Sequence, residues 1–315
     1  TAGTLGNRNL LINGDMRIDQ RNSGSTITLT TLTFPVDRWR GREDTDGTAT
    51  GGRDTDTPND EFTYSLKWTV GTADSSLGAT QFGDLQQRIE GNNSAVLGWG
   101  TSGAQSITVS FWVKSSVTGT YYVTPQNNDF NRSYPKSYTI NSANTWEYKT
   151  LTIPGDTSGT WLTNNGVGIF LSWCVGTGST YQGTANQWNA GGYLGASDQT
   201  NLLGTAGATF FLTGCQVELG TKATPFEHRN VGDELARCQR YYEVHNAQLD
   251  TARNGSGTSY GTWYFKQTKR NTSYTFNDAS GSFFSTNVIG INAVQVYQSA
   301  GVVRITTTAY VDNEL

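Results

Sequence analysis

The stretch Ile107-Thr108-Val109-Ser110-Phe111-Trp112-Val113 places an apolar side chain at every second position. Successive side chains of a β-strand point to opposite faces, so this alternation predicts a strand with one buried face and one solvated face. The same pattern recurs in three later stretches, at residues 146–153, 167–173 and 210–219. These four stretches make β-structure the dominant expectation for the first part of the chain.

Shorter strands are predicted around them, at residues 10–18, 62–70, 85–90 and 121–124. Turns rich in Gly, Asn, Thr and Ser separate the strands, and no long amphipathic helix alternates with them. A run of eight or more short strands of this kind is typical of a β-sandwich. We therefore expect a jelly-roll β-sandwich over residues 1–230.

One segment departs from this pattern. Leu235, Cys238 and Tyr242 recur at helical spacing, with Asp233 and Glu234 near the start. The sequence predicts a short helix and linker over residues 231–250, followed by a small C-terminal β domain over residues 251–315. Its strands are expected at residues 261–267, 273–276, 288–297 and 301–310. Because about 65 residues bury little surface alone, we expect this domain to pack against its neighbour or against copies of itself.

Composition and charge exclude several classes of function. The chain has 315 residues, of which 37 are Gly, and a formal net charge of −4. This balance gives no basic surface, so we expect no nucleic-acid partner. No apolar run reaches about 18 residues, so we expect no membrane insertion. The first four residues lack the basic and apolar regions of a signal peptide, and none is expected.

The sequence contains few of the residue patterns that enzymes use for catalysis. The two histidines, His228 and His245, lack zinc-ligand spacing, and no Gly-x-Ser-x-Gly elbow occurs. Cys174, Cys215 and Cys238 lie in apolar runs, which predicts reduced core residues rather than reactive thiols. We expect no enzyme, no catalytic residues and no cofactor. A carboxylate pair for polysaccharide hydrolysis stays open as an alternative, because any β protein can bring Asp and Glu across a groove.

The segment from Glu43 to Glu61 is acidic and rich in Gly and Thr. Asp44 and Asp46, like Asp54 and Asp56, sit at alternate positions, as carboxylates do at the start of a calcium loop. The spacing to a closing Glu does not fit an EF-hand. We expect a solvated loop and no metal site, with a bound metal as the alternative.

The most suggestive binding residues lie between residues 181 and 198. Sugars present flat apolar faces edged by hydroxyls, which aromatic rings and polar side chains recognise together. The candidates for glycan binding are Tyr181, Asn186, Gln187, Trp188, Tyr193 and Asp198. The alternative is a loop in which Trp188 fills the edge of its own sandwich or a subunit contact. Five other tryptophans lie in strand-like runs and are predicted to be core residues: Trp39, Trp68, Trp112, Trp146 and Trp173.

Several motifs, in order along most of the chain, resemble a group of bacteriophage virion surface and tail fibre proteins with a jelly roll like that of carbohydrate-binding modules. They are Asn9-Leu10-Leu11-Ile12-Asn13-Gly14-Asp15-Met16-Arg17-Ile18-Asp19-Gln20-Arg21, Asp37-Arg38-Trp39, Ser110-Phe111-Trp112-Val113-Lys114, Val217-Glu218-Leu219-Gly220, Ala223-Thr224-Pro225-Phe226-Glu227, Cys238-Gln239-Arg240-Tyr241-Tyr242-Glu243 and Phe265-Lys266-Gln267-Thr268-Lys269-Arg270.

This resemblance implies a non-enzymatic structural protein on the virion surface, made in the host cytoplasm. It implies a tail fibre or fibre tip that attaches to a host-surface glycan, with capsid decoration or a head fibre as the alternative. It also implies a homotrimer that contacts other virion proteins, since such parts are symmetric oligomers. Strands begin by about residue 9, without a preceding shaft, so we expect a short part rather than a long fibre.

Overall fold

The computed structural model describes residues 7–251, 259–273, 275–278, 285–288, 290–298, 303–312 and 314. The first four residues, from which we expect no signal peptide, lie outside this part. The chain divides into two compact units, Thr1–Arg229 and Asn230–Leu315.

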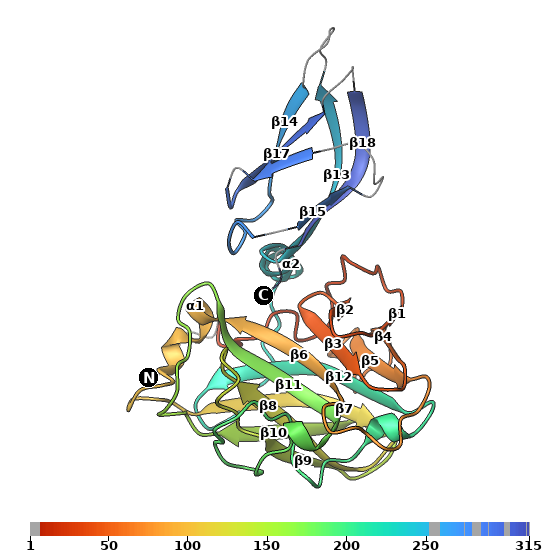
Figure 1. Cartoon of the computed structure of the whole chain (residues 1–315), viewed down its shortest axis with the longest axis vertical. Coiled ribbons are helices and arrows are strands. Elements are labelled where there is room, and N and C mark those ends of the chain that lie inside the picture. The colour runs from red at the N-terminus through yellow and green to blue at the C-terminus, as the bar shows by residue number, and fades with distance from the viewer. Residues whose placement is uncertain are drawn as a thin grey trace. The chain divides into compact units, whose positions relative to one another are not determined.

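The first unit is a sandwich of two six-stranded antiparallel sheets (Figure 1). Sheet A has the order β1 (Ile27–Thr28), β4 (Ala49–Asp54), β5 (Ser65–Val70), β12 (Thr209–Leu219), β7 (Ile107–Ser115) and β10 (Glu147–Ile153). Sheet B has the order β2 (Thr33–Val36), β3 (Trp39–Asp44), β6 (Phe82–Glu90), β11 (Val167–Thr177), β8 (Gly119–Gln126) and β9 (Lys136–Ile140). Four short helical turns complete it: α1 (Gly91–Ser94), η1 (Ala95–Leu97), η2 (Ser179–Tyr181) and η3 (Leu202–Gly204). The predicted mainly β sandwich is confirmed.

The core lies between the two sheets, and on β7 it takes Ile107, Val109, Phe111 and Val113, which are fully buried as predicted. The expected solvated face is wrong for the central strands, because Thr108 and Ser110 of β7 are also buried and β11 is buried along its whole length. The four long predicted strands correspond to β7, β10, β11 and β12, and the predicted strands at residues 85–90 and 121–124 lie within β6 and β8. The strand predicted at residues 62–70 forms only from Ser65 onward, as β5.

The strand predicted at residues 10–18 is absent. Leu10 and Gly14 each exchange one backbone hydrogen bond with β12, at 2.9 Å to Val217 and Cys215, but no continuous strand forms. Asn13 and Met16 have positive φ angles of 59° and 60°, which interrupt an extended chain. The Asn13 side chain accepts the Ile18 N–H and donates to the carbonyls of Ile18 and Asp37 at 2.7 and 2.9 Å. Asparagine competes with ladder bonding in this way, and the segment is irregular.

The same N-terminal segment is bonded to the end of the first unit. The Asn9 side chain donates to the Cys215 carbonyl at 3.1 Å and accepts the Val217 N–H at 3.0 Å. The Glu227 carboxylate accepts the Asn9 N–H at 2.7 Å. Arg229 donates to the Leu11 carbonyl at 2.9 Å. Several motifs that carry the phage resemblance therefore hold the sandwich together.

Three of the five tryptophans predicted to be core residues are buried, and two are not. Trp39, Trp68 and Trp173 are fully buried, as predicted, and the rings of Trp39 and Trp173 lie 5.2 Å apart between centroids. Trp112 and Trp146 are only partly buried, so their assignment to the core is wrong. Both rings contact aromatic side chains of sheet A: Trp112 packs on Tyr148 and Trp146 on Phe211.

The acidic segment is more ordered than a solvated loop, since β3 reaches Asp44 and β4 covers Ala49–Asp54. Asp54 pairs with Lys67 at 3.2 Å, and Asp56 pairs with Lys114. Within the described ranges, no three His, Cys, Asp or Glu side chains gather as a metal site would require. The three cysteines are buried and form no disulfide within the described residues, as predicted. No helix in the described part is long and apolar enough to cross a membrane.

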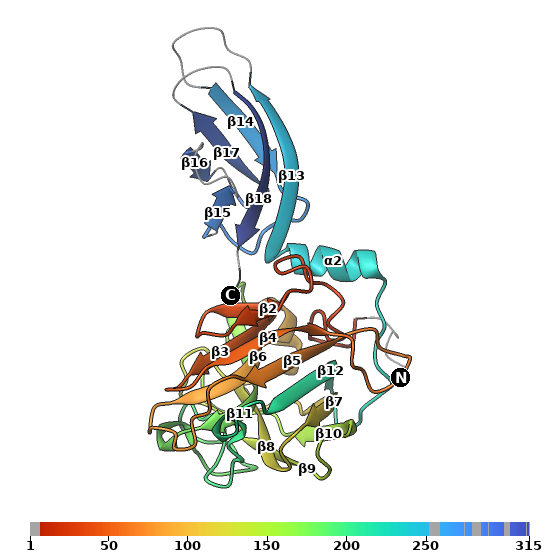
Figure 2. The same cartoon turned by 90° about the vertical axis from the view of Figure 1, so that its right-hand side faces the viewer.

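The second unit opens with α2 (Val231–Gln239), whose start is capped by the Asn230 side chain accepting the Gly232 N–H at 2.8 Å. Two three-stranded antiparallel sheets follow (Figure 2). One has the order β13 (Tyr242–Thr251), β18 (Val303–Asp312), β15 (Thr275–Asp278), and the other β14 (Ser259–Tyr264), β17 (Ala293–Gln298), β16 (Ser285–Val288).

Two expectations for this unit are wrong. The helix ends at Gln239, and most of the expected linker forms strand β13. The single strand expected at residues 288–297 is divided between β16 and β17, which pair with each other.

The motifs at residues 238–243 and 265–270 meet in a buried ion pair. Lys269 Nζ lies 2.6 Å from Glu243 Oε2, and both side chains are fully buried. Lys269 also donates to the Gln239 carbonyl at the end of α2. Burial lowers the pKa of Lys269, which Glu243 opposes. The pair fixes the end of α2 and the start of β13 to the segment that follows β14.

Candidate functional site

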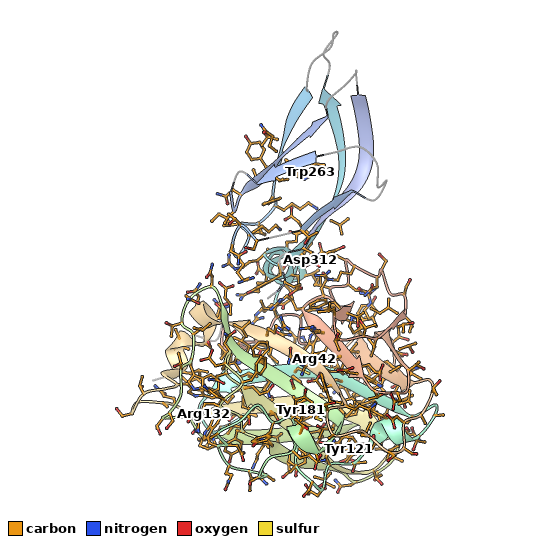
Figure 3. The ribbon with its side chains drawn as sticks, in the orientation of Figure 1. Arg42, Tyr121, Arg132, Tyr181, Trp263 and Asp312 are labelled. Atoms are coloured by element: carbon orange, nitrogen blue, oxygen red, sulfur yellow. The ribbon has the colours of Figure 1, made fainter. Side chains whose placement is uncertain are left out.

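A pocket of about 330 Å³ opens on the outer face of sheet B. Its walls are Arg42, Phe82, Gln126, Phe130, Tyr181, Gly192 and Leu194, and we call it the Tyr181 pocket. Arg42 and Tyr181 are labelled in Figure 3. Its volume falls within the range of about 300–1,000 Å³ that is usual for small-molecule sites.

Strand register brings the polar side of this pocket together. Arg42 on β3 is paired with Asp84 on β6, and its guanidinium donates to both carboxylate oxygens, with Nε to Oδ1 at 2.7 Å. Burial would lower the pKa of Arg42, but the Asp84 carboxylate outweighs burial and raises it. The guanidinium also lies 4.8 Å from the centre of the Phe82 ring. Arg42 is therefore a fixed cation whose charge is balanced by Asp84.

Gln126, at the end of β8, gives the pocket an acceptor without a partner. Its Nε2 donates to the Tyr193 carbonyl at 2.9 Å, which fixes the orientation of the amide. Its Oε1 is buried and has no hydrogen-bond partner, and the whole residue is 2% exposed. A buried acceptor left unpaired costs about 1–3 kcal/mol. A ligand hydroxyl that donates to Oε1 would recover that free energy.

Phe130 stands at the rim on a strained turn. Its φ is +52°, an uncommon value for a bulky residue, and its ring is 4.9 Å from that of Phe170. The turn is held by Asn127, whose Oδ1 accepts the N–H groups of Asn131 and Arg132 at 3.1 and 3.0 Å. The side chain of Phe130 remains 48% exposed. The fold therefore keeps an aromatic ring in solvent beside the pocket.

Gly192 allows the two sides of the pocket to approach. A Cβ at this position would lie 2.9 Å from both the Cβ and the carbonyl oxygen of Phe130, closer than real Cβ contacts. Nearby, Ser133 Oγ donates to the Gly191 carbonyl at 2.6 Å and accepts the Tyr193 N–H at 3.2 Å. These contacts fix residues 191–193 against the Phe130 turn.

Among the residues predicted from sequence, Tyr181 lines this pocket. Its ring packs edge-on against Phe82, with centroids 5.2 Å apart, and its carbonyl accepts the Leu194 N–H at 2.8 Å. Tyr193 acts through its backbone, by orienting Gln126. Their roles in glycan binding stay predictions.

Asp198 accepts a hydrogen bond from the Tyr122 hydroxyl, and its side chain is exposed. Burial, together with this bond, raises the pKa of Tyr122, so the phenol stays protonated. Asn186 is exposed and bonds Ser137, with Nδ2 to Oγ at 3.0 Å. Gln187 is exposed, and its carbonyl accepts from Asn189 at 2.8 Å.

Trp188 is placed apart from Tyr181, in a cluster of aromatic rings. Its centroid is 5.2 Å from Tyr134, 5.3 Å from Trp99 and 5.7 Å from Trp161. Its Nε1 donates to the Pro154 carbonyl at 3.1 Å. It is partly buried and packs against the core, in agreement with the alternative that it fills the edge of its own sandwich.

Sequence reasoning missed Arg42, Phe82, Gln126 and Phe130. The alternation along β8 carries a partial signal, because Tyr122, Thr124 and Gln126 share the face opposite the core positions Tyr121 and Val123. Nothing in the order of residues indicates that this face lies under the segment that follows β11. Register between distant strands decides which side chains meet.

No protein-family model matches the chain, and no curated protein matches it. Solved structures give weak likenesses. One is the enzymatically active domain of bacteriophage CBA120 tailspike protein 4, at 14% identity and a TM-score of 0.36, over 67% of this chain and 21% of that one. Another is TmCBM61 in complex with β-1,4-galactotriose, at 14% identity and a TM-score of 0.31, over 69% of this chain and 100% of that one. A third is the family 11 carbohydrate-binding module of Clostridium thermocellum, at 10% identity and a TM-score of 0.28, over 66% of this chain and 99% of that one.

The chain spans about a fifth of the tailspike domain that it resembles. Likenesses at this level carry no argument about function. The sandwich itself is established by the strand pairing described above, with two six-stranded antiparallel sheets enclosing one core.

Proposed function

We propose that this chain is a glycan-binding protein and that the Tyr181 pocket holds the sugar. The observation that carries the proposal is Gln126 Oε1, a buried acceptor without a partner in a cavity walled by the rings of Phe82, Phe130 and Tyr181. A sugar ring presents an apolar face to such rings and a hydroxyl to such an acceptor. Arg42, fixed by Asp84, offers donors at the opposite wall.

We propose that the protein binds its sugar without cleaving it. Glycoside hydrolysis ordinarily needs two carboxyl groups flanking the bond. None of the side chains that line the pocket carries a carboxylate. Both carboxylate oxygens of the nearby Asp84 already accept hydrogen bonds from Arg42. Incubation with host polysaccharide should leave its chain length unchanged. Shortened chains would support a polysaccharide depolymerase instead.

The biological setting that we propose is the surface of a bacteriophage particle, where the chain serves host attachment as a tail fibre or fibre tip. The ordered motifs at residues 9–21, 37–39, 110–114, 217–227, 238–243 and 265–270 support this setting. Purified protein should coat host cells, and soluble host glycan should compete with the coating. Binding to capsids without binding to cells would favour capsid decoration or a head fibre.

Replacing Phe130 by alanine should weaken glycan binding about tenfold, because the loss of an aromatic ring that covers a sugar face costs about 1.4 kcal/mol of binding free energy. Binding would be measured by calorimetry with the strongest ligand from a glycan array. Since 48% of the ring is exposed, the truncation should leave the fold intact, as circular dichroism would confirm. Leu32→Ala is the matched control, because Leu32 is an exposed apolar residue on another loop, 75% exposed. Equal binding by the Phe130 variant and the control would overturn the proposed site.

The proposed oligomer is a homotrimer formed through the second unit. Val231, Tyr264 and Ile291 of this unit are 51%, 75% and 38% exposed, which leaves apolar surface for a contact between copies. Light scattering after gel filtration should give about three times the 34.2 kDa chain mass, unchanged in high salt. A monomer at the concentrations used for cell binding would contradict the trimer, but not the glycan site.

A further inference from the structure

The outer face of sheet A carries a second hollow, a groove of about 640 Å³. We call it the Trp112 groove, and its walls and floor include Phe62, Ser110, Trp112, Tyr148, Thr150 and Phe226. None of these residues belongs to the Tyr181 pocket, which lies on the other sheet. The groove is therefore a separate feature of the same sandwich.

Cross-strand pairing between β7 and β10 builds one side of the groove. Tyr148 is paired with Trp112, and Thr150 is paired with Ser110, so two aromatic rings lie next to two hydroxyls on one face. The rings of Trp112 and Tyr148 are 5.3 Å apart between centroids, and Tyr148 is 46% exposed. An exposed aromatic pair of this kind offers ring faces to a ligand.

A β-bulge opens the floor. The register of β12 against β7 shifts between Thr213 and Gln216, and Gly214 inside this bulge has a φ of +59°. A Cβ at Gly214 would lie 2.8 Å from Phe62 Cζ and 3.2 Å from Trp112 Cδ1, in the space between the two aromatic sides. Phe62 is held in turn by Phe226, at 5.4 Å between centroids. The shape of the groove therefore depends on glycine at this position.

Two hydroxyls line the groove, one on the buried Ser110 and one on the exposed Thr150. In the part of the chain that the structure describes, the hydroxyls of Ser110 and Thr150 have no hydrogen-bond partner in the protein, although both residues line the groove. Glu61 and Lys222 also line it, and their opposite charges leave it without a strong net charge. Rings beside free hydroxyls match the face and edge of a pyranose, and the charge balance matches an uncharged one.

We infer that the Trp112 groove is a second saccharide-binding site, which takes a neutral glycan segment with a sugar face against Trp112 and Tyr148. Its volume suits a small ligand, whereas a stable protein partner would bury about 1,200–2,000 Å² in total. The inference stands apart from the proposed function of the Tyr181 pocket, since the two sites share no residue. Two sites on one chain would raise the avidity for a surface that bears repeated glycans.

Tryptophan fluorescence distinguishes the two sites, because Trp112 lines the groove while no tryptophan lines the Tyr181 pocket. The full chain would be titrated with neutral gluco-, galacto-, manno- and N-acetylglucosamine-based tetrasaccharides. We expect at least one of them to change the emission, and Phe130→Ala to leave that change intact. Tyr148→Ala should weaken this binding about tenfold or more.

Two further variants provide a second test of the groove and a control. Thr150→Val removes a floor hydroxyl at nearly constant volume and should also weaken the binding, even if Tyr148→Ala is unstable. Leu32→Ala removes a leucine that is 75% exposed and lines neither hollow, and should change nothing at the groove. If no tetrasaccharide alters the emission, or if the change persists in Tyr148→Ala and Thr150→Val, the groove is not a saccharide site. Binding that Phe130→Ala alone abolishes would support the Tyr181 pocket and overturn the groove.

Discussion

Replacing Lys269 by methionine should destabilise the second unit by about 3–5 kcal/mol, because it leaves the fully buried Glu243 carboxylate without its cation. The variant also removes the donor to the Gln239 carbonyl at the end of α2. Hydrogen exchange of the amides in α2 and at the start of β13 would measure the loss. Protection there should fall sharply while the amides of β7 and β12 stay protected.

Two companion variants test whether the loss of stability comes from the buried ion pair. Lys266→Met removes a nearby lysine whose Nζ is exposed and donates to the Val244 carbonyl at 2.8 Å, so it should cost little. Lys269→Met combined with Glu243→Leu removes both charges and should recover much of the lost stability. If Lys266→Met and Lys269→Met destabilised the second unit equally, the buried ion pair would contribute no more to stability than an exposed lysine.

Asp37 should make the first unit less stable as the pH rises from about 4 to 7. Burial raises the pKa of this carboxyl from its ordinary value of 3.8 to about 6, against opposing hydrogen bonds from Gln20. Between these two values the folded chain holds a proton that the unfolded chain has released. Stability therefore falls with rising pH across this window, by about 3 kcal/mol in total at pH 7.

Asp37→Asn should abolish that slope. Asparagine keeps Oδ1, which accepts the N–H groups of Gln20 and Arg21 at 3.1 and 3.3 Å, and carries no charge. Denaturant unfolding at several pH values between 4 and 7 would compare it with the unchanged chain. Asp198→Asn is the control, because that carboxylate is exposed. A slope that survives in Asp37→Asn would assign the pH dependence to another group.

The sandwich could be predicted from sequence because its signal is local. The alternation of Ile107, Val109, Phe111 and Val113 needs only the period of a strand, and these four side chains face the core. The error at Trp112 has the same origin: large apolar side chains are usually core, but this one occupies the opposite phase of the same strand. Alternation indicates which residues share a face, and residue size does not.

The candidate sites could be predicted only in part, because they depend on pairing between distant strands. The aromatic and polar mix of its own loop is enough to indicate Tyr181. Gln126 and Arg42 reach the same pocket through the order β3-β6-β11-β8 within sheet B, which no local pattern contains. Likewise, the shape of the Trp112 groove depends on the bulge at Gly214. Nothing in the sequence distinguishes this glycine from the rest of the 37 glycines in the chain.

The hydrogen bonds between Asn9 and the backbone at Cys215 and Val217 also constrain how the protein is made. They join residues separated by 206 and 208 positions, so the early segment of the first unit waits for nearly the last part of the same unit. Until residue 229 has emerged, the growing chain carries β-strands whose closing partners do not yet exist. The first unit therefore completes its folding only after its last strand has been made, and chaperones have their greatest opportunity to bind it before that point.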